Sequence, residues 1–129
     1  MSSDGRLYEG FLPGRHGIDA YGNGGFRFGQ MSHRGSILML PSGVHAWDVT
    51  DPAGIDGRSL APVLAERETI ELLLIGTGAD IVFVPDPLRQ RLKAAGIGLD
   101  AMQTGAAART YNILMGENRK VAAALIAVP

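Results

Sequence analysis

The sequence is most informative at Asp100-Ala-Met-Gln-Thr-Gly-Ala-Ala-Ala-Arg-Thr-Tyr-Asn-Ile-Leu114, where a predicted strand runs directly into a predicted helix. Residues 97–102 form the strand, and Thr104 is placed to be the N-cap of a helix that extends to residue 115 and is stopped by Gly116. Because four apolar residues recur at helical spacing, this helix is expected to pack against a sheet. They are Ala107, Tyr111, Leu114 and Met115.

A second strand and helix precede this pair. Residues 69–75 are an apolar segment, predicted to be a buried strand, that runs into Gly76-Thr77-Gly78. An aspartate N-cap, a proline after it and a glycine at the end predict a helix over residues 87–95. Alternating strands and helices are typical of an α/β domain. Two further strands are expected at residues 81–84 and 121–128.

The amino-terminal half is rich in glycine. Seven of the 18 glycines lie within residues 14–35, which predicts short strands joined by tight turns. Asn23-Gly24 is a β-hairpin signal because both residues tolerate positive φ angles. Strands are then expected at residues 36–40 and 44–49, with one or two helical turns in residues 59–66.

Length and composition limit the classes of protein. A chain of 129 residues is expected to form one domain over residues 1–129, with residues 1–15 partly flexible. The absence of cysteine excludes disulfides and thiolate metal sites. Twelve basic and 13 acidic residues leave a net charge of −1, which argues against a nucleic-acid-binding protein. No apolar run approaches the roughly 20 residues of a transmembrane span, and the first residues match neither a signal nor a transit peptide, so a cytoplasmic protein is expected.

One candidate ligand site follows from the predicted topology. If strands 69–75 and 97–102 are parallel neighbours, the loops that leave their carboxyl ends lie at the same edge of the sheet. Glycine N–H groups, the start of the helix and the charge of Arg109 could then bind a small anion or another small molecule. The alternative is a turn and a capped helix that serve stability alone. The candidate ligand-binding residues are Gly76, Thr77, Gly78, Thr104, Arg109, Thr110 and Asn112.

Arg109 separates these two interpretations. Its guanidinium has to reach solvent, a carboxylate or a ligand, because an unpaired charge is too costly to bury. A pairing with Glu117 or Asp100 is expected and would make Arg109 a stabilising residue. A head group open to residues 76–78, with no carboxylate in reach, would instead leave Arg109 free for an anion.

Other polar residues do not suggest a catalytic or metal site. His16, His33 and His45 are spaced by 17 and 12 residues, which matches no metal-binding motif. No catalytic residue, metal or cofactor is predicted. Trp47 is a candidate partner contact because a lone exposed tryptophan is a typical interface anchor; the alternative is a tryptophan packed on the sheet.

Taken together, these segments resemble the family of small proteins related to mitochondrial complex I assembly factor 3. The resemblance covers most of the chain. One departure is Gln103, where the family is associated with an aspartate, so a candidate acid is missing from the helix entrance. The matching segments are residues 18–22, 37–41, 47, 72–78, 102–104, 107–112 and 121–125.

The resemblance implies a single layered α/β (α+β) domain with a mixed β-sheet, helices on one side and a second small β-sheet on the other. The mitochondrial relatives act as binding factors in the assembly of respiratory complex I. The first functional hypothesis is therefore a non-enzymatic assembly factor with a protein partner. The second is a small-molecule or anion-binding domain, including a cryptic enzyme, that uses residues 76–78 and the helix beginning at Thr104.

Overall fold

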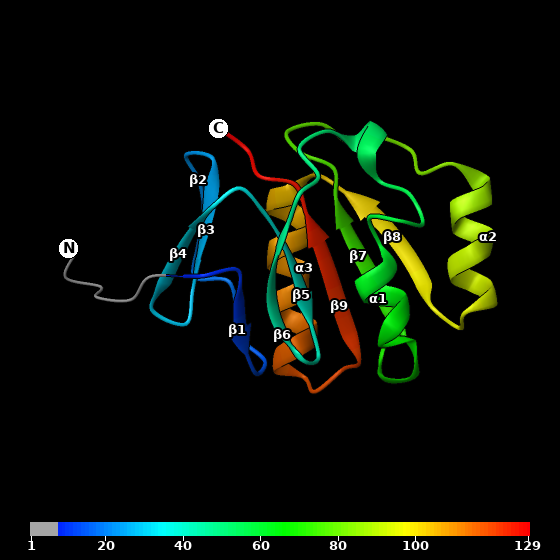
Figure 1. Cartoon of the computed structure of the whole chain (residues 1–129), viewed down its shortest axis with the longest axis horizontal. Helices are drawn as coiled ribbons and strands as arrows, with labels where there is room; N and C mark the ends of the chain where they lie inside the picture. The colour runs from blue at the N-terminus through cyan, green and yellow to red at the C-terminus, as the bar shows by residue number, and fades with distance from the viewer. Residues whose placement is uncertain (1–7) are drawn as a thin grey trace.

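The computed structural model describes residues 8–129, which form two β-sheets and three α-helices (Figure 1). The larger sheet has the strand order β1 (Phe11–Pro13), β6 (Gly43–Trp47), β5 (Ser36–Leu40), β9 (Val121–Leu125), β7 (Leu72–Gly76) and β8 (Gly98–Met102). The smaller sheet contains β2 (Ala20–Gly22), β3 (Gly25–Phe28) and β4 (Met31–Arg34). The helices are α1 (Ala61–Ala65), α2 (Asp86–Ala94) and α3 (Thr104–Gly116), and short 3₁₀ segments lie at Pro52–Gly54 and Arg67–Thr69.

The larger sheet is mixed. β7 is parallel to both of its neighbours, with Leu74 opposite Asp100 of β8 on one side and opposite Ala123 of β9 on the other. The remaining strand pairs of this sheet are antiparallel. The prediction that the strands near residues 69–75 and 97–102 are parallel neighbours is therefore confirmed.

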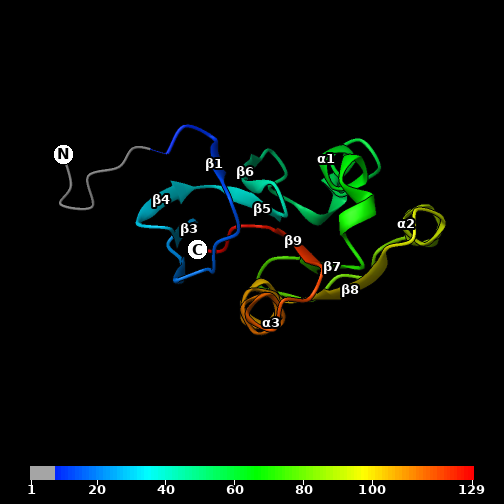
Figure 2. The same cartoon turned by 90° about the horizontal axis from the view of Figure 1, so that it is seen from below.

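The two faces of the larger sheet carry different layers (Figure 2). Because side chains alternate along β7, Leu73 packs into one core cluster with Val63 of α1 and Leu92 of α2, whereas Leu74 packs into a second cluster with Tyr111 of α3. The small sheet contributes to the second cluster as well. The mixed sheet and the second small sheet are confirmed, but the helices occupy both faces, and α3 shares its face with the small sheet.

Two predicted strands differ in the structure. Residues 81–84 form a loop rather than a strand, because the N–H of Val82 donates to the Thr77 hydroxyl at 3.1 Å and not to a neighbouring strand. β9 ends at Leu125, before the predicted end at residue 128, because the N–H of Ala127 donates to the Ser36 hydroxyl at 3.0 Å.

Helix starts also differ from the prediction. The N-cap of α2 is Pro85 rather than Asp86, and Asp86 lies inside the first helical turn. A negative charge in that turn still interacts favourably with the helix dipole. None of the helices within residues 8–129 is long and apolar enough to span a bilayer.

The amino-terminal segments fold as short strands. Asn23 and Gly24 have φ angles of 54° and 82° and join β2 to β3, which confirms the predicted hairpin. The N–H of Gly24 donates to the carbonyl of Val128 at 2.8 Å, so the hairpin is tied to the chain that follows β9. Of the segment expected to be flexible, residues 1–7 lie outside the described residues, and β1 pairs with β6.

Candidate functional site

Thr104 joins the two loops that were predicted to face each other. Its hydroxyl accepts the N–H of Gly78 at 3.0 Å and donates to the carbonyl of Ile126 at 2.7 Å. Its own N–H donates to the carbonyl of Gly78 at 2.9 Å. Gly76 permits this close approach, because a Cβ at that position would lie 2.9 Å from the Thr104 Cα. The end of β7 and the start of α3 are therefore in direct contact.

The capping role predicted for Thr104 is wrong. The N-cap of α3 is Gln103, whose side chain makes no capping hydrogen bond, and Thr104 is the first residue inside the helix. Its side chain is fully buried between β7 and β9, so its hydroxyl bonds to these neighbouring segments rather than to its own helix. Gly78 has a φ of 102°, a conformation that glycine adopts without penalty.

Backbone N–H groups at this junction are already used by protein acceptors. The N–H of Thr77 donates to the carbonyl of Met102 at 2.9 Å. The N–H of Gly78 donates to the Thr104 hydroxyl, and the N–H of Thr104 donates to the carbonyl of Gly78. The Thr77 hydroxyl donates to the carbonyl of Asp80 at 2.6 Å. These contacts favour the alternative interpretation, in which the junction stabilises the fold, over an anion site formed by residues 76–78.

The other candidate residues on α3 serve different neighbours. The Asn112 amide makes two hydrogen bonds with the backbone of Ile18, each 2.8 Å long, and so fixes the segment before β2 onto the helix. The Thr110 hydroxyl lies 3.8 Å from the sulfur of Met102. These side chains are therefore bound to the protein and do not converge on the Gly76–Gly78 turn.

Arg109 is exposed, and within residues 8–129 it has no ion pair. The expected pairing with Glu117 or Asp100 is therefore wrong for the described part of the chain. The guanidinium reaches solvent beside an open hollow of about 490 Å³ between α3 and β2. Other residues that line this hollow are Asp19, Tyr21, Gly105 and Asn112.

Trp47 is not an exposed anchor. Its side chain is only 6% exposed and belongs to the core cluster on the face covered by α1 and α2. The indole N–H donates to the carbonyl of Ser59 at 2.9 Å. The candidate partner contact at Trp47 is therefore wrong, and the sheet-packing alternative holds.

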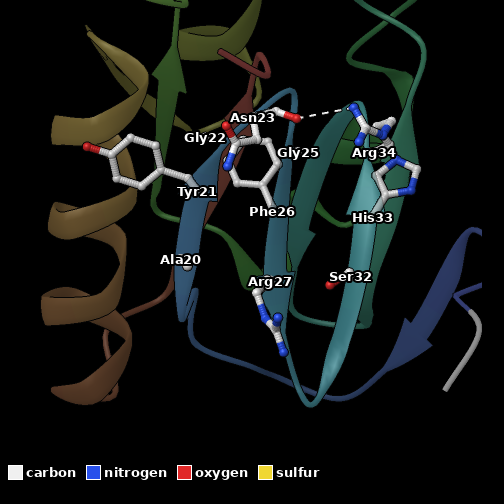
Figure 3. Close-up of a pocket in the computed structure, with 10 residues that line it drawn as sticks. All are labelled: Ala20, Tyr21, Gly22, Asn23, Gly25, Phe26, Arg27, Ser32, His33 and Arg34. Carbon is white, nitrogen blue, oxygen red and sulfur yellow. Dashed lines mark hydrogen bonds between the residues drawn. The ribbon is translucent and has the colours of Figure 1, made fainter. Parts of the chain in front are cut away.

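Two arginines flank an open hollow of about 410 Å³ on the small sheet (Figure 3). Arg27 of β3 and Arg34 of β4 project from the face opposite the core, and Arg34 also donates to the carbonyl of Asn23 at 3.3 Å. The sequence alone does not reveal this surface, because it depends on the register of three short strands. Alternation in Phe26-Arg27-Phe28 was the signal. The small residues on the same face are Ala20, Gly22, Gly25 and Ser32.

An apolar loop follows the Gly76–Gly78 turn and is exposed to solvent. Ile81 is 62% exposed, Val82 is 41% exposed and Phe83 is 90% exposed. We call these three residues the apolar tip. The sequence predicted a short strand at residues 81–84, because an apolar run by itself does not distinguish a strand from an exposed loop.

A serine, a histidine and a glutamate meet at the β5–β6 turn. The Ser42 hydroxyl donates to Glu66 at 2.6 Å and lies 3.0 Å from Nε2 of His45. Because the single serine proton is used for Glu66, Nε2 of His45 has to be the donor in its contact and cannot accept that proton. This arrangement ties the turn to α1 and differs from a Ser–His nucleophile pair. No group of metal-ligating side chains in the described residues is arranged to hold an ion.

A family model described as a protein of unknown function (DUF498/DUF598) matches residues 18–126, which include all elements from β2 to β9. The chain belongs to this family. The match explains why the resemblance read from the sequence extends over most of the chain. Among the strands of the described residues, only β1 lies outside the matched range.

Similar proteins include one that is named assembly factor 3. The chain is 39% identical to an uncharacterized protein of Rhodobacter capsulatus over 95% of this chain and 90% of that protein. It is 32% identical to NADH dehydrogenase [ubiquinone] 1 alpha subcomplex assembly factor 3 of Danio rerio over 87% of this chain, and it spans only 64% of that relative's length. A crystal structure of a Bartonella henselae protein, described as an outer membrane protein, is 52% identical with a TM-score of 0.88, over 92% of this chain and 99% of the other.

Proposed function

We propose that this chain is a non-enzymatic, protein-binding assembly factor that acts in the cytoplasm and takes part in the biogenesis of respiratory complex I. One observation carries the proposal: 112 aligned residues, 87% of the chain, relate it to proteins named as assembly factors of NADH dehydrogenase. Among the described residues, the exposed apolar tip supports a binding role. The polar groups of the β7–α3 junction bond to one another, which argues against a ligand site at residues 76–78.

Deletion of the gene in the native cell tests the proposal. Membranes of the deletion strain should have less NADH:quinone oxidoreductase activity, and native gels should show less assembled complex I together with smaller subcomplexes. Succinate dehydrogenase activity of the same membranes is the matched control and should not change. Assembled complex I at the parental level in the deletion strain would contradict the proposal.

A second candidate function is the binding of a small anion, now at the hollow beside Arg109 rather than at residues 76–78. The exposed guanidinium without an ion pair in the described residues favours it. Millimolar inorganic phosphate should then raise the melting temperature of the wild-type protein and leave Arg109→Met unchanged, because a ligand stabilises only the state that binds it. Without phosphate both proteins should melt together. A wild-type melt that does not respond to phosphate would argue against this function for phosphate-like anions.

A further inference from the structure

The apolar tip is the most prominent exposed apolar surface in the described part of the chain. Ile81, Val82 and Phe83 are consecutive, and the Phe83 ring is almost entirely in solvent. An isolated exposed apolar residue is ordinary, but a contiguous apolar group is typical of an interaction site. Phenylalanine is also among the aromatic residues that are enriched at interface cores.

The base of the apolar tip is fixed on both sides. The Thr77 hydroxyl donates to the carbonyl of Asp80 and accepts the N–H of Val82, so the incoming chain is tied to the end of β7. On the outgoing side Val84 is buried in the core, and its carbonyl accepts Nε of Arg89 at 3.3 Å. A tip that is already held in one conformation loses less conformational entropy when it binds.

The exposed charged residues that flank the apolar tip in the sequence are both acidic, whereas Arg89 is half-buried and donates to the carbonyl of Val84. Asp80 and Asp86 stand on either side of it in the sequence, and both are exposed. An anionic lipid surface would repel these carboxylates, because such membranes attract basic segments. A two-fold contact between the tips of two copies would bring like charges together, which is also unfavourable.

We infer that the apolar tip is the docking element by which this chain binds a partner protein that presents an apolar pocket with a basic rim. Phe83 fills the pocket, Ile81 and Val82 pack at its mouth, and Asp80 and Asp86 face the basic rim. The inference rests on the proposed function, since it specifies the surface with which an assembly factor would hold its client. It also gives the Gly76–Gly78 turn and the Thr77 hydroxyl a purpose, which is to hold the docking element in place.

Photo-crosslinking of the full chain in the native cell tests the inference. Phe83 is replaced by p-benzoylphenylalanine in one strain, and Ile113 in a control strain, because Ile113 is an exposed apolar residue of α3 at 56% exposure. Irradiation should give one discrete protein adduct from position 83 that is absent from position 113. The double substitution Asp80→Lys and Asp86→Lys should reduce the position-83 adduct by roughly tenfold, as expected for lost charge complementarity at an interface. Glu117→Lys, a charge reversal at an exposed residue after α3, should leave the adduct unchanged.

The possible results either support or overturn the inference. The inference is overturned if position 83 crosslinks to a second copy of this chain or to lipid only. It is also overturned if positions 83 and 113 give the same adducts, or if the charge reversal leaves the adduct unchanged. If the lysine variants melt at a lower temperature, Asp80→Asn with Asp86→Asn replaces them, and a decrease in the adduct is still required. A charge-dependent protein adduct with a protein unrelated to complex I supports the docking element and contradicts the proposed function. A complex I assembly defect on deletion, without any position-83 adduct, supports the function and overturns the docking element.

Discussion

The hydroxyl of Thr104 could have either of two roles at the start of α3. A threonine before a helix commonly caps it, and the sequence pattern favours that role. In the structure the same hydroxyl bonds to Gly78 and Ile126, which are far from it in the sequence. Local sequence cannot distinguish the two roles, because both use one hydroxyl next to the first helical turn. The location of the residue could be predicted from the sequence, whereas its hydrogen-bond partners depend on the strand order.

Thr104→Val should reduce the free energy of unfolding by about 2–4 kcal/mol, because it leaves the buried N–H of Gly78 and the carbonyl of Ile126 without this partner. Loss of a simple N-cap would amount to only about 1 kcal/mol. Urea unfolding followed by circular dichroism measures the difference. Thr110→Val is the matched control and should change stability by less than about 0.5 kcal/mol, since its hydroxyl makes only a 3.8 Å contact with sulfur. Equal effects of the two substitutions would contradict the assigned role.

Elements with strong local signals could be predicted from the sequence. The helix over residues 87–95 and the hairpin at Asn23-Gly24 are found close to their predicted positions, because helix-boundary and turn residues act locally. The loop at residues 81–84 could not be predicted, because the N–H of Val82 donates to the Thr77 hydroxyl and not to a neighbouring strand. The hollow between Arg27 and Arg34 required the register of three strands.

A substitution at Gly76 tests how closely β7 packs against α3. Gly76→Ala should destabilise the protein by about 1–3 kcal/mol, because the added Cβ would lie 2.9 Å from the Thr104 Cα and 2.9 Å from Leu125 Cδ2 in a closely packed contact. Gly116→Ala is the control: nothing lies within 4 Å of its added Cβ, and alanine favours a helical conformation. Thermal or urea unfolding should show a neutral or stabilising effect at Gly116. A neutral effect at Gly76 would mean that the helix can move away without penalty.

At the scale of the whole molecule, the order of the strands in the larger sheet could not be predicted from local sequence patterns. The alternation of strands and helices predicted the parallel pair β7 and β8, but nothing local indicates that β9 inserts between β5 and β7. Nor did the sequence indicate that α3 and the small sheet would share one face. The position of β9 and the shared face of α3 and the small sheet both depend on which apolar faces pack against one another. That packing depends on all the elements together and not on any one segment.

Stability of the whole molecule should decrease on mild acidification. Burial lowers the pKa of both His33 and His45 from 6.5, against opposing effects of the Ser36 backbone and the Glu66 charge. Just below pH 6.5 the unfolded chain therefore binds more protons than the folded protein. The contribution of the two neutral histidines to the free energy of unfolding is complete above pH 6.5 and is lost as the pH falls below that value. Urea unfolding at pH 7.5, 6.5 and 5.5 measures the trend. The double variant His33→Gln and His45→Gln should flatten it, and an identical slope in that variant would assign the effect to other groups.

The central position of β9 has a consequence for synthesis on the ribosome. β9 supplies the pairing between β5 and β7, yet it comes later in the chain than either strand. Until residues 121–125 have left the exit tunnel, the nascent chain holds two separate fragments of sheet whose unpaired edges and apolar faces are open to chaperones and to misassociation. The core can therefore be completed only after β9, the last strand of the described residues, has been made.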